Sequence, residues 1–293
     1  MSTYCLWRIL GNDLPPRHHE TQTEENLRFI LENEETLPDC EKRFLLNRIV
    51  DLAKLDRFKT LISQYGYEWE EIPFDVHDYR AIPLPQHRAA YLTNVNQARN
   101  YCIDRSLCSA EEFEYVLPFD GACFFRRDGW DQLDAVARVN FGDAYFFCPM
   151  WRLRHREYVL STEQAPVIRE TYRQSGRGGA EITRIGLTEP QIVFGKSADL
   201  TFCERLMYAN ADKAELLCRL GLAGVWENWE PKGSRGQPIR SDSVHCQQVK
   251  MAGFVCRLPS GNLQADTNNR HRGMDRQLGM KLLVDQTDAL AEI

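Results

Sequence analysis

The sequence lacks any run of apolar residues that approaches the ~20 needed to cross a lipid bilayer, so it predicts no transmembrane helix. It contains no internal repeat and no low-complexity tract. Its first residues lead directly into an apolar run, Tyr-Cys-Leu-Trp, and do not have the layout of a signal peptide. These absences favour an ordinary globular protein.

Paired cysteine motifs are also missing, although the chain has ten cysteines. No Cys-x-x-Cys occurs, which argues against a zinc knuckle and against a redox-active pair. Several cysteines, such as Cys123 and Cys148, stand inside apolar runs, where a free thiol packs as a small hydrophobic side chain. The cysteine pattern therefore predicts a protein of the reducing cytoplasm.

An excess of positive charge is absent too. The formal net charge is −6, which argues against a nucleic-acid partner bound through bulk positive charge. Neither Gly-x-Gly-x-x-Gly nor a Walker loop occurs, which weakens dinucleotide and P-loop interpretations. The 293 residues, 43% of them hydrophobic, suffice for one large domain or for one domain with an appended lobe.

What the sequence does contain is a regular alternation of β-type and helical segments in its first half. Apolar runs predict strands at residues 4–10, 43–50, 68–74 and 113–118. Apolar residues at helical spacing predict helices over residues 23–34, from residue 52 to Gly66, and over residues 93–107. This alternation is typical of an α/β fold, with a Rossmann-type, mostly parallel sheet flanked by helices.

The second half is more mixed and predicts an α+β arrangement. Helices are expected at residues 130–139 and 201–220, and strands at residues 144–151 and 253–258. A proline-rich loop is expected earlier, at residues 75–88, either as the border of a binding cleft or as a mobile connector. Two basic stretches, residues 231–240 and 268–276, favour a phosphate-bearing ligand in an acidic protein. Solvated surface is the alternative for both stretches.

The candidate site centres on Asp120, which interrupts an apolar run, Phe-Glu-Tyr-Val-Leu-Pro-Phe-Asp-Gly. An unpaired carboxylate costs roughly several kcal/mol to bury. We therefore expect Asp120 to emerge at the strand end, where open α/β sheets bind ligands. A simple Asp-Gly turn between two strands is the alternative. Arg99, in the helix just upstream, is placed to reach a phosphate.

Four features together resemble the GT-A class of nucleotide-sugar glycosyltransferases. They are the polar loop from Arg8 to Asp13, the strand end at Asn47-Arg48, the helix with Ala98-Arg99-Asn100, and the strand end Pro118-Phe119-Asp120-Gly121. The resemblance covers roughly residues 4–150. It implies a nucleoside diphosphate-sugar donor and a glycan or other hydroxyl acceptor.

The resemblance also implies how the chain is divided. Residues 1–150 would form the nucleotide-sugar half and residues 151–293 the acceptor-binding half of one continuous domain. The donor-binding residues that it implies are Arg8, Asn12, Asp13, Asn47, Arg48, Arg99, Asp120 and Gly121.

In this family an Asp-x-Asp element holds a divalent metal on the diphosphate of the donor. Pro118 stands where the first Asp would be, so Asp120 is the carboxylate that remains. The resemblance implies Mn²⁺ or Mg²⁺ on Asp120, with His245 or His271 completing the site. Arginine and lysine side chains that neutralise the diphosphate are the alternative.

An inverting enzyme needs a general base for the acceptor hydroxyl. Glu189, which leads into the apolar run Pro-Gln-Ile-Val-Phe, is the expected base, with Asp242 and Glu181 as alternatives. Two other functions stay open: a nucleotidyl- or phosphotransferase acting on sugar phosphates, and a non-catalytic module that binds nucleotides or sugars.

Overall fold

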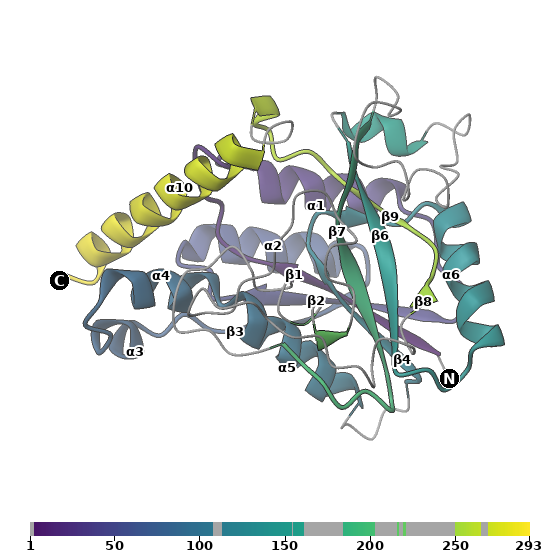
Figure 1. The fold of residues 1–293 in the computed structure, drawn as a ribbon. Coiled ribbons are helices and arrows are strands. Elements are labelled where there is room, and N and C mark those ends of the chain that lie inside the picture. The colour runs from purple at the N-terminus through teal and green to yellow at the C-terminus, as the bar shows by residue number, and fades with distance from the viewer. Residues whose placement is uncertain are drawn as a thin grey trace.

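The computed structural model describes residues 3–107, 113–153, 155–160, 184–202, 216, 219–220, 250–264 and 269–293. Within these residues, nine strands form one sheet in the order β3-β2-β1-β4-β7-β6-β9-β5, and β8 pairs with β6 outside this path (Figure 1). Helices flank the sheet, and most strand pairs are parallel. The predicted α/β class is confirmed.

The first half of the sheet is parallel, as its sequence pattern predicts. β1 lies between β2 and β4, and β3 pairs with β2. The register places Ile9 opposite Asp120, so β1 and β4 end side by side. The strands of this half are β1 (Tyr4–Leu10), β2 (Cys40–Asn47), β3 (Glu68–Ile72) and β4 (Tyr115–Asp120).

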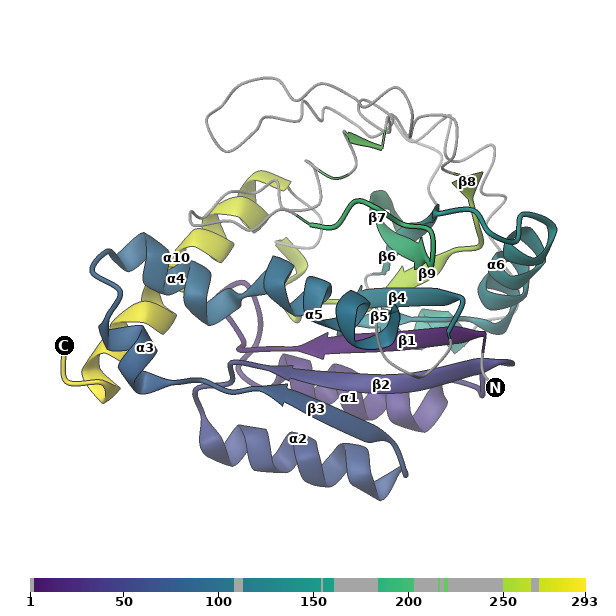
Figure 2. The ribbon, with the colours of Figure 1, turned by 90° about the horizontal axis from the view of Figure 1, so that it is seen from below.

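Helices cover both faces of these strands. Alternate side chains of a strand point to opposite sides, and apolar side chains on both sides need to be covered. Leu27 and Phe58 pack in one core cluster on one face, and Trp7 and Cys102 pack in another on the opposite face. Figure 2 shows α1 and α2 below the strands and α5 above them. These helices are α1 (Gln22–Asn33), α2 (Leu52–Gln64) and α5 (Val95–Leu107).

The second half of the sheet is mixed. β6 runs antiparallel to β7 and parallel to β8 and β9, while β7 and β5 add antiparallel pairs with β4 and β9. α6 covers β6 through Trp130 and Leu133, which pack with Phe146. The elements of this half are β5 (Cys123–Phe124), α6 (Arg127–Val139), β6 (Tyr145–Leu153), a 3-10 helix (Arg156–Leu160), β7 (Arg184–Gly195), β8 (Lys250–Met251) and β9 (Val255–Arg257).

Residues 75–88 are more structured than the predicted connector. They contain α3 (Val76–Arg80) and the start of α4 (Pro85–Thr93). The Asp75 carboxylate caps α3 by accepting from the backbone N–H of His77 at 2.7 Å. Pro85 stands at the start of α4, where its missing N–H removes no helical hydrogen bond. The prolines here mark a helix start that periodicity alone did not reveal.

Residues 269–276, most of the basic stretch predicted to favour a phosphate-bearing ligand, belong to the helix α10 (Asn269–Leu290). Met280 and Val284 of α10 pack with Leu14 from the loop after β1. A Cβ atom at Gly279 would lie 2.5 Å from the carbonyl oxygen of Leu14, so the helix and the loop are in close contact. α10 also lies beside α4 (Figure 1).

The other predictions about the fold have different outcomes. No helix in the described part of the chain combines the length and the apolar character that a membrane span needs. The helix predicted over residues 201–220 and the basic stretch 231–240 lie largely or wholly outside the described residues. β6 crosses residue 150, so the sheet continues from the first half of the chain into the second.

The close approach of β1 to the residue after β4, Gly121, can be tested by substitution. A Cβ atom there would lie 2.6 Å from the Ile9 carbonyl oxygen, so we expect Gly121→Ala to lower the free energy of unfolding by roughly 1–3 kcal/mol. Gly273→Ala is the control, because nothing lies within 4 Å of its added Cβ and alanine favours the helix by up to about 1 kcal/mol. Urea unfolding measures both, and equal stability of the two variants would contradict the contact.

Candidate functional site

The carboxyl ends of β1, β2 and β4 meet at one edge of the sheet, because these strands are parallel neighbours. Asp120 is the last residue of β4, as expected for a carboxylate that leaves a buried strand. The loop after β1 begins beside it, since Ile9 is its register partner. This edge is where open α/β sheets bind their ligands.

Asp120 lies between two arginines. Its Oδ1 accepts a hydrogen bond from Nη2 of Arg99 at 2.8 Å, and its Oδ2 accepts one from Nη1 of Arg257 at 3.1 Å. The side chains of Arg99, Arg257 and Asp120 are 6%, 18% and 26% exposed. We name these three residues the arginine clasp. Two guanidinium groups and one carboxylate leave a formal excess of one positive charge.

Contacts on several sides position Arg99 near the beginning of α5. Asn94, with a φ of 44°, ends α4 in the left-handed region, and its Nδ2 donates to Oδ1 of Asn47 at 2.8 Å. This bond fixes the beginning of α5 to the end of β2. The Arg99 guanidinium also lies over the ring of Phe202, 5.0 Å from its centroid. Arg99 therefore has little freedom to leave the clasp.

Two polar side chains that sequence reasoning missed complete this geometry. Arg257 ends β9, and Gln191, which is 1% exposed, stands in β7 with its Nε2 3.4 Å from Oδ2 of Asp120. Each interrupts an apolar strand, Phe-Val-Cys-Arg-Leu or Pro-Gln-Ile-Val-Phe. Buried polar groups need partners, so this interruption was a usable signal.

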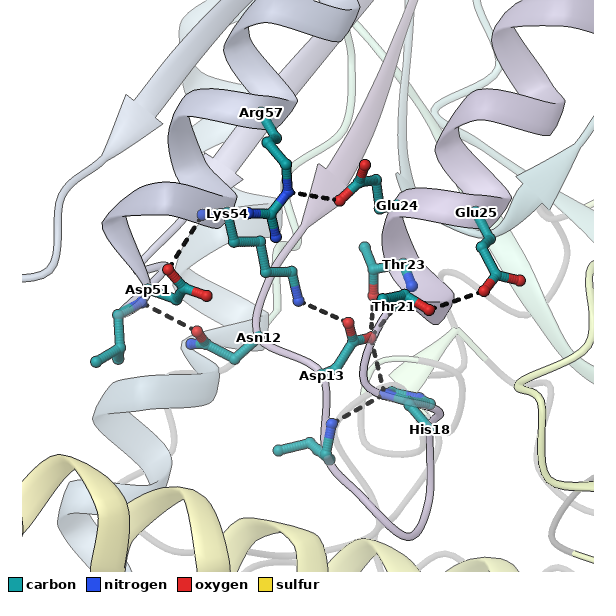
Figure 3. Close-up of polar contacts among 12 residues, drawn as sticks. Asn12, Asp13, His18, Thr21, Thr23, Glu24, Glu25, Asp51, Lys54 and Arg57 are labelled. Carbon is teal, nitrogen blue, oxygen red and sulfur yellow. Dashed lines mark hydrogen bonds and ion pairs between the residues drawn. The ribbon is translucent and has the colours of Figure 1, made fainter.

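Asp13, a predicted donor-binding residue, joins two helices to the loop after β1 (Figure 3). Its Oδ2 lies 2.6 Å from Nζ of Lys54, and its Oδ1 accepts from the backbone N–H of Thr23 at 3.2 Å and from the Thr23 hydroxyl. Thr21, at the helix cap, makes no side-chain cap bond. Asp13 takes over that role, because a carboxylate is favourable at a helix N-terminus.

Asn12, Asn47 and Arg48 hold the edge of the sheet together. Nδ2 of Asn12 donates to the Arg48 carbonyl at 2.8 Å, and Nδ2 of Asn47 donates to the Thr93 carbonyl at 2.9 Å. Nη1 of Arg48 donates to the Tyr91 carbonyl at 2.9 Å, and its guanidinium stacks on the Tyr91 ring. The structure thus places these three predicted residues at the expected edge, bonded to backbone.

Arg8 lies in the interior instead of at this edge. It is 1% exposed, and its Nη2 lies 2.5 Å from Oε1 of Glu34. Oε2 of Glu34 lies 2.9 Å from Nζ of Lys42, and Oε1 also accepts from the backbone N–H of Phe125 at 2.7 Å. This buried cluster ties β1, β2 and the end of α1 together, which is a structural role for Arg8.

The pKa of His18 is affected by the positive charge around the loop after β1. Its Nδ1 accepts from the backbone N–H of Leu14 at 3.3 Å, so the 3.8 Å approach to Asp13 is a contact of a neutral ring. Burial, followed by nearby cations, holds the pKa of His18 well below its usual value of 6.5. Those cations are Arg17, Arg257, Arg276 and Lys54.

The described residues do not fit the metal site that the sequence predicts at Asp120. Both of its oxygens accept from guanidinium groups, and a cation there would face Arg99 and Arg257 at short range. In the described part of the chain, no cluster of three His, Cys, Asp or Glu side chains is arranged to hold a metal. His271 is exposed on α10, and His245 lies outside the described residues.

The predicted general bases are not placed by these coordinates. Glu181 and Asp242 lie outside the described residues. Glu189 belongs to β7, where the neighbouring Thr188 pairs with Met150 of β6. The side chain of Glu189 is outside the described part of the structure. All three remain sequence predictions.

Comparison with known proteins gives a similarity of fold. No protein-family model and no curated protein matches this chain. It is similar to S. aureus TarS 1-349, at 12% identity and a TM-score of 0.38 over 71% of this chain and 52% of that chain. The same fragment in complex with UDP gives 9% identity and a TM-score of 0.43 over 95% and 70%. The similarity to mouse xyloside xylosyltransferase 1 has a sequence identity of 11% and a TM-score of 0.31, over 67% of each chain.

These structures are GT-A-type glycosyltransferases, the class that the sequence resembles. The chain spans about half the length of the TarS fragment in the first of these matches. Similarities with TM-scores of 0.43 and lower carry no argument about substrate or mechanism. The site must be judged by its own geometry.

The buried cluster around Arg8 can be tested with Glu34→Gln. This change leaves Arg8 and Lys42 buried without a counter-charge, so we expect a loss of roughly 3–5 kcal/mol in the free energy of unfolding. Glu114→Gln breaks an exposed pair with Lys196 and should cost under about 1 kcal/mol. Urea denaturation measures both, and similar losses would rule out a special role for the buried cluster.

The neutral state of His18 predicts a pH dependence of stability. Unfolding restores a pKa near 6.5, so the unfolded state binds an extra proton below that pH, and stability falls as the pH drops through 6.5. His18→Gln should reduce this fall, whereas His77→Gln, at an exposed position, should leave it unchanged. Urea midpoints at several pH values measure it; an unaltered slope in His18→Gln would refute the assignment.

Proposed function

We propose that this protein transfers a glycosyl group from a nucleoside diphosphate-sugar to an acceptor hydroxyl. The arginine clasp at the carboxyl edge of a parallel sheet is the observation that supports this proposal most strongly. Ligands of open α/β sheets bind at this edge. Guanidinium groups match the paired oxygens of phosphates, and the clasp carries an excess of positive charge.

The chemistry assigns a role to each side chain of the clasp. The bond between C1 of the sugar and the β-phosphate oxygen breaks, and a bond forms from the acceptor oxygen to C1. Negative charge grows on the leaving diphosphate, where Arg99 and Arg257 stabilise it. Asp120 holds the two guanidinium groups in position.

The acceptor hydroxyl loses its proton to a general base, for which we propose Glu189, with Asp242 and Glu181 as alternatives. Residues 151–293 supply the acceptor-binding surface in this proposal. The acceptor is a glycan or another molecule with a free hydroxyl group.

A ligand screen followed by product analysis tests the function. We expect one of UDP, GDP, ADP or CDP to stabilise the protein against thermal unfolding, by about 3–4 kcal/mol at ~100–1,000 times its Kd. The matching nucleoside should stabilise it much less, because it lacks the diphosphate.

The matching nucleotide-sugar, incubated with a panel of hydroxyl acceptors, should then release free nucleoside diphosphate. Release of pyrophosphate would instead indicate nucleotidyl transfer. Donor binding without turnover on any acceptor would indicate a binding module. No stabilisation by any of the four nucleotides would contradict the proposal.

A further inference from the structure

The carboxylate that a divalent metal would need is already occupied by cations. Oδ1 of Asp120 accepts from Arg99 at 2.8 Å, and Oδ2 accepts from Arg257 at 3.1 Å. Two unit charges of the same sign repel by about 4 kcal/mol at ~4 Å and an effective dielectric constant of ~20. A divalent ion beside both guanidinium groups would face about twice that repulsion from each. The clasp therefore disfavours a metal on Asp120.

The positive charge extends beyond the clasp. Arg257 belongs to the clasp and is also one of the cations close enough to His18 to lower its pKa. The region thus runs from the end of β4 to the loop after β1. The other cations that lower the pKa of His18 are Arg17, Lys54 and Arg276, and Lys54 is paired with Asp13.

The charge of this region is suited to a multiply charged anion. Within the clasp, two guanidinium groups flank one carboxylate, a formal excess of one positive charge among these three side chains. Arg99 and Arg257 come from opposite parts of the chain, on α5 and β9, and converge on one point. Convergent guanidinium groups give bidentate contacts to phosphate oxygens.

We propose that the arginine clasp itself neutralises the diphosphate of the donor, so that binding and transfer need no divalent cation. This inference rests on the proposed glycosyl transfer and adds how the leaving group is handled. Arg99 and Arg257 bind the diphosphate oxygens. Asp120 is a positioning residue that keeps the two like-charged groups together, and it is not a metal ligand.

The first test uses the unaltered protein. Calorimetric titration with UDP, GDP, ADP and CDP is carried out in EDTA, and again with MnCl₂ or MgCl₂. We expect the Kd of the responding nucleotide to change by less than about threefold between these conditions. Tightening by tenfold or more with Mn²⁺ or Mg²⁺, equivalent to about 1.4 kcal/mol, would overturn the inference.

Variants then separate the clasp from a metal site. Arg257→Gln should weaken nucleotide binding in EDTA by about 10- to 100-fold, as expected for lost hydrogen bonds to a charged group. Arg257→Lys should weaken it less, because the charge stays while the fork is lost. Arg105→Gln is the matched control on α5, since it breaks a half-exposed pair with Glu70 and should bind as the wild type does.

Asp120→Asn gives opposite results under the two models. Removing its charge raises the positive excess of the clasp, so nucleotide binding in EDTA should persist or tighten, while kcat falls because the guanidinium groups lose their orientation. A metal ligand would instead show metal-dependent affinity in the wild type that vanishes in this variant. Loss of EDTA binding as severe as in Arg257→Gln would also overturn the inference.

The outcomes distinguish a failure of the metal-free clasp from a failure of the proposed glycosyl transfer. If no nucleoside diphosphate binds under any condition, the proposed glycosyl transfer is wrong. If binding requires a metal, glycosyl transfer stands and only the metal-free clasp is wrong. Should Arg257→Gln fail to fold, the comparison of EDTA with Mn²⁺ still decides, because it uses the unaltered chain.

Discussion

The placement of two guanidinium groups against one carboxylate is the constraint on which the site depends. Arg99 and Arg257 would repel each other without Asp120 between them. The beginning of α5 and the ends of β4 and β9 must therefore meet at the same point. The close approach of Gly121 to β1 and the turn at Asn94 are local conditions for that convergence.

The polar residues of the sheet edge divide into two groups. Asn12, Asn47 and Arg48 use their hydrogen bonds on backbone carbonyls and so give the edge its shape. Arg99 and Arg257 meet at Asp120, next to its partly exposed carboxylate. The first group stabilises the backbone at the edge of the sheet, and the second group supplies positive charge beside Asp120. A polar loop in a sequence does not by itself reveal which of these tasks a side chain performs.

Local patterns predicted much of the first half of the fold. Residues 4–10 form the strand expected from their apolar run, and Asp120 ends its strand as the cost of burying a carboxylate requires. Partners distant in sequence could not be predicted. The interior position of Arg8 depends on Glu34 and Lys42, and the pairing of Asp120 depends on Arg257. Single-sequence periodicity contains no information about which distant strand supplies a counter-charge.

Arg257 follows Asp120 by 137 positions, and this separation affects how the molecule acquires its site. The parallel strands of the first half can pair before β9 exists, but the clasp must wait for the closure of a very long loop. Contacts of such high sequence separation form slowly. A nascent chain on the ribosome would thus have a sheet edge long before it had the arginine clasp. The affinity for the ligand would then appear only after the rest of the sheet had folded.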